Sequence, residues 1–190
     1  DDLTHETFIS LDDVNFKDNK LELNGIAGFT SSDFIDLDNI SHYLQLYKIG
    51  TNELAYEFKL ETIDSYGFSL NDQYNYKYTG FKLSLDLTNT PIDLGSYYAK
   101  IEVNNNNVSM KTLLKSMDLN HCNVSSKVND VTYRISTNGL YSYRIDLDVE
   151  KADVDYSKIN KPSARPSLAT IDSVNIDNNT LTIKGYGFVH

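Results

Sequence analysis

The chain contains 190 residues, of which 40% are hydrophobic and 23% are charged, so it can bury a core and is not a disordered chain. Its net charge of -10 argues against a nucleic-acid partner, because a protein must supply cations to displace the counterions of phosphate groups. No apolar run approaches the roughly 20 residues of a membrane-spanning helix, and we therefore expect no membrane span.

Alternation of apolar and polar residues predicts short β-strands along most of the chain. The first hairpin is expected within residues 11–25, where Asp18 and Asn19 provide a turn between two alternating segments. Further strands are expected, in chain order, around residues 44–46, 54–60, 81–87, 97–103, 131–135 and 141–149. Each of these strands has one apolar and one polar side, which is typical of antiparallel sheets that expose one face to solvent.

Turn residues separate these strands, and helical spacing is scarce. Residues 50–52 and the pair Asn138-Gly139 predict hairpins, since Asn and Gly tolerate a positive φ. Residues 33–43 can hold one helical turn, and residues 108–117 fit either a short helix or a strand. The whole pattern predicts an all-β fold, an immunoglobulin-like antiparallel β-sandwich, with two such sandwiches in tandem.

The end of the chain repeats its beginning, because residues 171–185 match residues 11–25 at a constant offset. The identical pairs are Asp12/Asp172, Val14/Val174, Asn15/Asn175, Asn19/Asn179, Leu21/Leu181 and Gly25/Gly185. Such reuse of one structural unit is typical of modular, extended proteins.

We expect a first sandwich over residues 1–117 and, over residues 118–190, a second, smaller sandwich or the start of the next repeat. The asparagine run 104–107 marks an exposed loop or a break near this boundary. Residues beyond 168 either begin another copy or fold back to complete a sandwich with residues 118–150. A lone hairpin is only marginally stable in water, which favours completion of a sandwich. The chain could instead form a single domain with an ordered tail, or its tail could pair with another subunit.

The residue types that usually build active or metal sites are scattered. The histidines, His5, His42, His121 and His190, have no metal-binding spacing, and the lone Cys122 excludes an intrachain disulfide and a cysteine-rich zinc site. His121 and Cys122 are adjacent and point to opposite faces of an extended chain, so they do not form a nucleophile and base. No G-x-S-x-G elbow, P-loop or dinucleotide-binding pattern occurs. We expect no catalytic residue, no cofactor and no metal site.

Carboxylates two residues apart occur at Asp36/Asp38, Asp146/Asp148 and Asp153/Asp155, the spacing with which many sugar-nucleotide glycosyltransferases hold a divalent metal. Asp146 and Asp148 lie on the polar side of a predicted strand, which favours a solvated strand face. Surface calcium at the Asp-rich loops (residues 12–18 and 33–38) is the competing interpretation, although the EF-hand pattern is missing.

Tyr74, Tyr76 and Tyr78 are the candidate ligand-binding residues. Their alternation would line them up on one side of an extended segment, as a platform that stacks on sugar rings or on a protein partner. The interpretation that we favour is that they cap the edge of a sandwich with half-buried rings.

Three motifs together resemble a known family. The first is the repeated pattern of Leu/Ile-Asp-x-Val, a short Asp/Asn turn, Leu-x-Leu/Ile-x-Gly and a following Phe. The others are residues 78–81 (Tyr-Thr-Gly-Phe) and 95–103 (Gly-Ser-Tyr-Tyr-Ala-Lys-Ile-Glu-Val). Over residues 8–104 and 168–189 the chain resembles the immunoglobulin-like accessory regions of Gram-positive cell-envelope proteins, notably those appended to teichoic-acid glycosyltransferases and polymerases. This resemblance implies a non-catalytic β-sandwich that mediates oligomerisation, spacing or polymer contact, while a separate domain performs any transfer.

Three functions follow as expectations. The first is a non-catalytic structural or interaction module, with a cell-wall polymer, a glycan or a second copy of the chain as partner. The second is a carbohydrate- or teichoic-acid-binding module that uses the tyrosine segment. The third is an accessory C-terminal region of a cell-wall glycosyltransferase. The expected location is the bacterial cell envelope or surface, or the cytoplasmic face of the membrane if the parent is a teichoic-acid enzyme.

Overall fold

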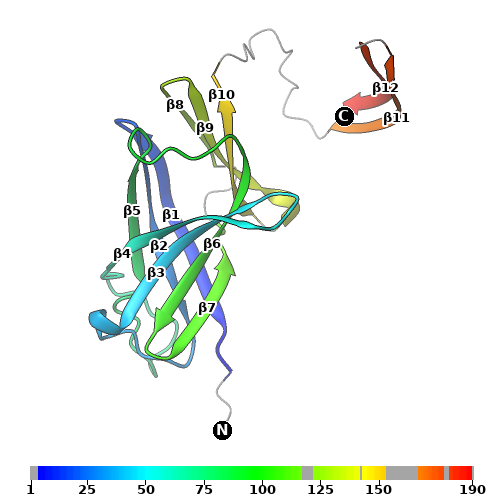
Figure 1. Cartoon of the computed structure of the whole chain (residues 1–190). Coiled ribbons are helices and arrows are strands. Elements are labelled where there is room, and N and C mark those ends of the chain that lie inside the picture. The colour runs from blue at the N-terminus through cyan, green and yellow to red at the C-terminus, as the bar shows by residue number, and fades with distance from the viewer. Residues whose placement is uncertain (1–3, 117–121, 142, 153–166, 178–179, 190) are drawn as a thin grey trace. The chain divides into compact units, whose positions relative to one another are not determined.

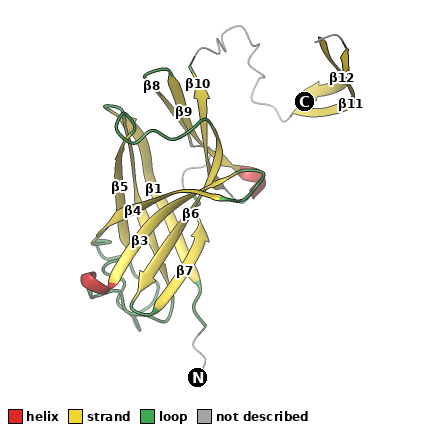
Figure 2. Cartoon of the chain, in the orientation of Figure 1, coloured by secondary structure: helices red, strands yellow, loops and turns green. Residues whose placement is uncertain are grey.

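The computed structural model describes residues 4–116, 122–141, 143–152, 167–177 and 180–189. Its regular structure is almost entirely β-strand (Figures 1 and 2). The strands are β1 (Thr7–Lys17), β2 (Lys20–Phe29), β3 (Ile40–Lys48), β4 (Leu54–Ile63), β5 (Gly80–Asp86), β6 (Gly95–Asn105), β7 (Val108–Leu113), β8 (Asn123–Val128), β9 (Val131–Asn138), β10 (Arg144–Lys151), β11 (Ser167–Asp177) and β12 (Thr180–Val189). The described segments also hold two single-turn 3-10 helices, η1 (Leu37–Asn39) and η2 (Gly139–Tyr141). The predicted all-β class is confirmed.

Strands β1 to β10 form one antiparallel sheet in the order β1-β2-β5-β4-β3-β6-β10-β9-β8, with β7 paired to β6. The sheet curls until it is nearly closed into a barrel. Strand β1 lies at one edge of this sheet and contacts the residues that follow β7. There the Leu11 N–H donates a hydrogen bond to the Lys115 carbonyl oxygen at 3.2 Å. The antiparallel pairing is as predicted, and the ten strands belong to one continuous sheet.

Local turn chemistry accounts for several element boundaries. Asp18 and Asn19 adopt φ values of 49° and 61°, which a two-residue hairpin turn requires, so the predicted first hairpin is confirmed. The ambiguous segment 108–117 contains strand β7, and the helical turn expected within residues 33–43 is η1.

The prediction of a tight two-residue turn at Asn138-Gly139 is wrong, although β9 and β10 do pair. Helix η2 follows β9 directly, and β10 begins only at Arg144. The Asn138 side chain accepts a hydrogen bond from the Leu140 N–H at 3.2 Å and donates one to the Asp146 carboxylate at 3.0 Å. These two bonds hold Asn138 at the end of β9, where a longer loop to β10 begins.

Contacts between residues divide the chain into two compact units, Asp1–Ala152 and Asp153–His190. This division falls later than the predicted boundary at residue 117. The physical reason is that β10 pairs with β6, Asp146 opposite Tyr98, which brings residues 144–151 into the middle of the first sheet. The strands between residues 123 and 151 therefore complete the first unit.

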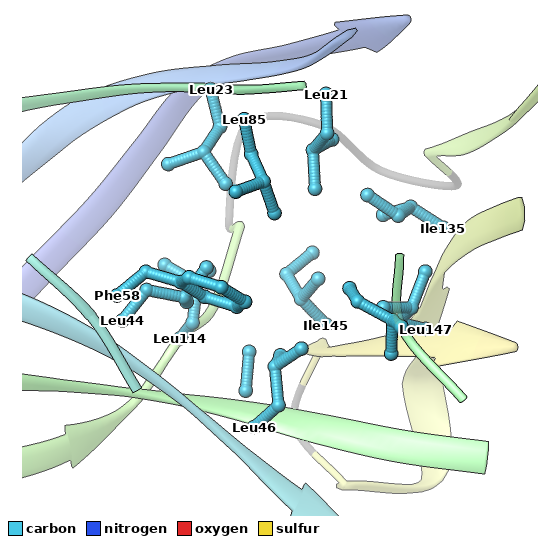
Figure 3. Close-up of a pocket in the computed structure, with 12 residues that line it drawn as sticks. Leu21, Leu23, Leu44, Leu46, Phe58, Leu85, Leu114, Ile135, Ile145 and Leu147 are labelled. Carbon is cyan, nitrogen blue, oxygen red and sulfur yellow. The ribbon is translucent and has the colours of Figure 1, made fainter. Parts of the chain in front are cut away.

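Apolar side chains of the first unit fill the space that the curled sheet encloses. Figure 3 shows leucines of β2, β3 and β5 facing Ile135, Ile145 and Leu147 of β9 and β10. A cavity of about 20 Å³ remains between them, and its lining is apolar throughout. Such a cavity is barely large enough for one water and offers it no hydrogen-bond partner. We interpret it as a dry packing defect in the core.

The sequence repeat is also a repeat of local structure. Strands β1 and β2 pair with Leu11 opposite Gly25 and have a bulge between Leu11 and Asp13. Strands β11 and β12, which form a two-stranded sheet of their own, pair with Ile171 opposite Gly185 and have a bulge between Ile171 and Ser173. The two hairpins share the same register, pair for pair, and the same irregularity.

Candidate functional site

The outer face of β3, β6 and β10 carries a cluster of aromatic and charged side chains that we call the tyrosine platform, comprising Tyr47, Tyr98, Lys100, Arg144 and Asp146. Because successive residues of a strand face opposite sides of the sheet, these side chains lie on the face away from the core residues of the same strands, such as Leu46, Ala99 and Leu147. Tyr98 and Asp146 are nevertheless only 8% and 7% exposed. Tyr47 and Tyr98 are direct cross-strand partners. Their rings are stacked, with 5.4 Å between centroids and 20° between planes. The strand register itself creates the stack.

Two cations lie over the stacked rings. The Lys100 Nζ is 4.7 Å from the ring centre of Tyr47 and 5.8 Å from that of Tyr98, and the Arg144 guanidinium carbon is 4.9 Å from the ring centre of Tyr98. Arg144 also donates two hydrogen bonds to Asp146, at 2.6 and 3.0 Å. A bidentate pair fixes the plane of the guanidinium, so the platform is rigid before anything binds to it.

A buried glutamine extends the tyrosine platform toward β4 and β7. The Gln45 amide nitrogen donates to carboxylate oxygens of Glu57 and Glu102, each at 2.7 Å, and its carbonyl oxygen accepts from the Tyr47 hydroxyl at 2.9 Å. Burial alone raises the pKa of Glu102, but its contact with Lys111 at 3.0 Å and its hydrogen bonds bring the pKa below its ordinary value. Two carboxylates thus share one neutral donor on an outward face, which orders the polar rim of the surface.

The predicted binding residues Tyr74, Tyr76 and Tyr78 lie in the loop between β4 and β5 and not in an extended strand. Tyr76 is only 1% exposed and packs edge-on against Phe8, with 5.4 Å between ring centres. The expectation of one shared, outward side is therefore wrong for Tyr76. Tyr74 and Tyr78 are half-buried, as in the interpretation that we favoured. Tyr74 borders an open depression of about 470 Å³, and its role in binding stays a prediction.

We expect Tyr76→Phe to stabilise the first unit by about 1 kcal/mol. The Tyr76 hydroxyl is buried and has no hydrogen-bond partner among the described residues, so folding removes it from water without compensation. Phenylalanine keeps the ring contacts and removes the uncompensated group. Chemical denaturation followed by circular dichroism would measure the change. A loss of stability would show that the hydroxyl has a partner, such as a bound water.

The remaining candidates are occupied by structural roles or lie outside the described residues. Burial, and then Asp13, raise the pKa of the half-buried Cys122 thiol, which opposes a nucleophilic role. Asp148 accepts a hydrogen bond from the Ser96 hydroxyl at 2.6 Å, and Asp36 accepts from the Asp38 N–H at the start of η1. Across the described segments, no group of three or more His, Cys, Asp or Glu side chains could hold a metal ion. His121, His190, Asp153 and Asp155 fall outside the described residues.

No protein-family model matches the chain, and no curated protein matches it. Among solved structures, the crystal structure of S. aureus TarS is similar, with a TM-score of 0.51 and 10% sequence identity. The similarity covers 95% of this chain and 29% of the TarS chain, so this chain spans less than a third of that protein's length. At this identity the match shows a shared fold. In the part of the chain that the structure describes, no helix is long and apolar enough to span a membrane.

Proposed function

We propose that the chain is a non-catalytic interaction module of a bacterial cell-envelope protein, built from immunoglobulin-like β-sandwich units in tandem. Its tyrosine platform is the contact surface for a cell-wall polymer. Its setting is the cell envelope or surface, or the cytoplasmic face of the membrane as an accessory region of a teichoic-acid glycosyltransferase. The fold likeness to part of S. aureus TarS and the resemblance to envelope accessory regions support this setting.

The observation that carries the proposal is the stack of the half-buried Tyr47 on the buried Tyr98, on the face of the sheet away from the core leucines, with cations over both rings. Lys100 and Arg144 lie over the rings, so the platform would meet a sugar through the exposed part of Tyr47 and through cationic donors to the sugar hydroxyl groups. The net charge of -10 opposes a polyanion, so the neutral sugar substituents of the polymer are the expected contact. The repeated hairpin supports the tandem arrangement, since it reuses one register and one bulge.

We expect the chain to be retained on immobilised wall teichoic acid, and Tyr47→Ala to weaken retention about tenfold, the effect of losing roughly 1.4 kcal/mol of aromatic contact. Affinity chromatography at several salt concentrations would measure retention. Tyr66→Ala is the matched control, because Tyr66 is 90% exposed in a loop away from these strands. Equal retention of both variants, or no retention of the unmodified chain at millimolar protein, would contradict the proposal. A sedimentation coefficient that rises with concentration in the unmodified chain but not in Tyr47→Ala would instead identify a second copy as the partner.

A further inference from the structure

In the first unit, the β1–β2 hairpin is completed by β5. Strand β5 pairs along β2 with Leu85 opposite Leu21, Leu83 opposite Leu23 and Phe81 opposite Gly25. Phe81 is fully buried. A Cβ atom placed on Gly25 would lie 2.9 Å from the tip of the Phe81 ring, so the missing side chain of Gly25 makes room for that ring.

The β11–β12 hairpin repeats the part of this arrangement against which β5 pairs, namely the β1–β2 hairpin. Gly185, Ile183 and Leu181 of β12 hold the register positions of Gly25, Leu23 and Leu21 of β2. Among the described strands, β12 pairs with β11 alone. An unpaired strand edge presents a row of free N–H and C=O groups, and a two-stranded sheet is marginally stable without a further strand.

We propose that the edge of β12 is an acceptor for an antiparallel strand of the β5 type, in which a glycine and an aromatic residue precede apolar residues at alternate positions. The aromatic residue lies opposite Gly185, and the apolar residues two and four positions later lie opposite Ile183 and Leu181. Main-chain hydrogen bonds then provide affinity, and a glycine at position 185, which carries no side chain, favours an aromatic partner as Gly25 does in the first unit. The partner is thus defined by a strand pattern that the chain itself contains in β5.

A synthetic peptide with the sequence of residues 79–88 (Thr-Gly-Phe-Lys-Leu-Ser-Leu-Asp-Leu-Thr) tests this acceptor edge on the full chain. We expect saturable binding by fluorescence anisotropy, with NMR shifts of backbone amides concentrated in β12. A peptide with Phe81→Ala is expected to bind at least tenfold more weakly. A peptide with Lys82→Ala is the matched control, since Lys82 points to the exposed face of β5, and it is expected to bind as the parent peptide does.

Because these variants change only the peptide, the comparison does not depend on how the chain tolerates a substitution. Absence of binding at millimolar peptide would overturn the proposal, as would equal affinity of the Phe81→Ala peptide. Amide shifts confined to β2, which would indicate displacement of the chain's own β5, would overturn it as well. None of these results depends on whether the tyrosine platform binds a polymer.

Discussion

Gly25→Ala is expected to destabilise the first unit by about 3 kcal/mol, at the upper end of the usual effect of overpacking. A Cβ atom at Gly25 would lie 2.1 Å from the Ser10 carbonyl oxygen and 2.9 Å from the Phe81 ring. The first of these neighbours is backbone in the paired strand, next to the bulge between Leu11 and Asp13. It cannot swing aside as a flexible side chain could, so β1 must shift.

Thermal and chemical denaturation would measure this effect, with an expected fall in Tm of roughly 10 °C for a unit of this size. Gly139→Ala is the matched control, because no atom lies within 4 Å of its added Cβ and its φ is not in the left-handed region. A melting temperature unchanged in both variants would mean that β1 and β2 do not approach as closely as described.

The second large effect concerns pH and the buried His42. Its side chain lies in the core between β2 and β4. The Ala27 carbonyl oxygen, 3.0 Å from Nε2, can only accept a hydrogen bond, so Nε2 carries the proton. Nδ1 then accepts from the Thr62 hydroxyl at 2.9 Å. The neutral ring is fully satisfied in this tautomer.

Burial lowers the pKa of His42 from 6.5 to about 4, against the smaller opposing effect of the Ala27 hydrogen bond. Between these two pH values the unfolded chain binds a proton that the folded chain does not, so the free energy of unfolding rises with pH in this window. The neutral His42 ring therefore contributes about 3 kcal/mol to the free energy of unfolding above pH 6.5, and this contribution decreases as the pH falls toward 4. Below pH 4 it is gone.

Chemical denaturation at a series of pH values from 7 to 4 would measure the slope. We expect His42→Gln to be less stable at pH 7 but to lack most of this slope, while His5→Gln, a change near the start of β1, retains it. The difference between the unmodified chain and His42→Gln isolates the histidine, because acidic groups such as Glu102 are common to both. Parallel pH curves for the unmodified chain and His42→Gln would show that the ring is not buried in its neutral form.

Local patterns predicted local structure well. The alternation and the Asp18-Asn19 turn predicted the first hairpin, and its repetition in sequence corresponds to a second hairpin of the same register. Strand order could not be predicted, because periodicity says which side of a strand is buried and not which strand lies beside it. The insertion of β10 between β6 and β9 is the main example, and it moved the division of the chain from residue 117 to Ala152.

The tyrosine platform escaped prediction for the same reason. Tyr98 and Lys100 were visible on the polar side of one predicted strand and Arg144 on that of another, but only the pairing of β3, β6 and β10 brings them together. Conversely, the alternation of Tyr74, Tyr76 and Tyr78 gave a false strand signal.

The signal that could have prevented this error was the density of Asp and Asn around those tyrosines. The side chains of Asp64, Asn71 and Asn75 each accept a hydrogen bond from a backbone N–H two residues later, at 2.7 to 3.0 Å. Such Asx turns bend the chain and compete with an extended conformation. The loop between β4 and β5 is folded for this reason.

The position of β10 has a mechanical consequence. Its residues are hydrogen-bonded to β9 along one edge and to β6 along the other, and Ala152 follows it directly at the end of the first unit. Tension that enters the unit through Ala152 therefore loads two ladders at once, and both must yield before the strand can be pulled free. A terminal strand at the rim of the sheet would yield after the loss of one ladder.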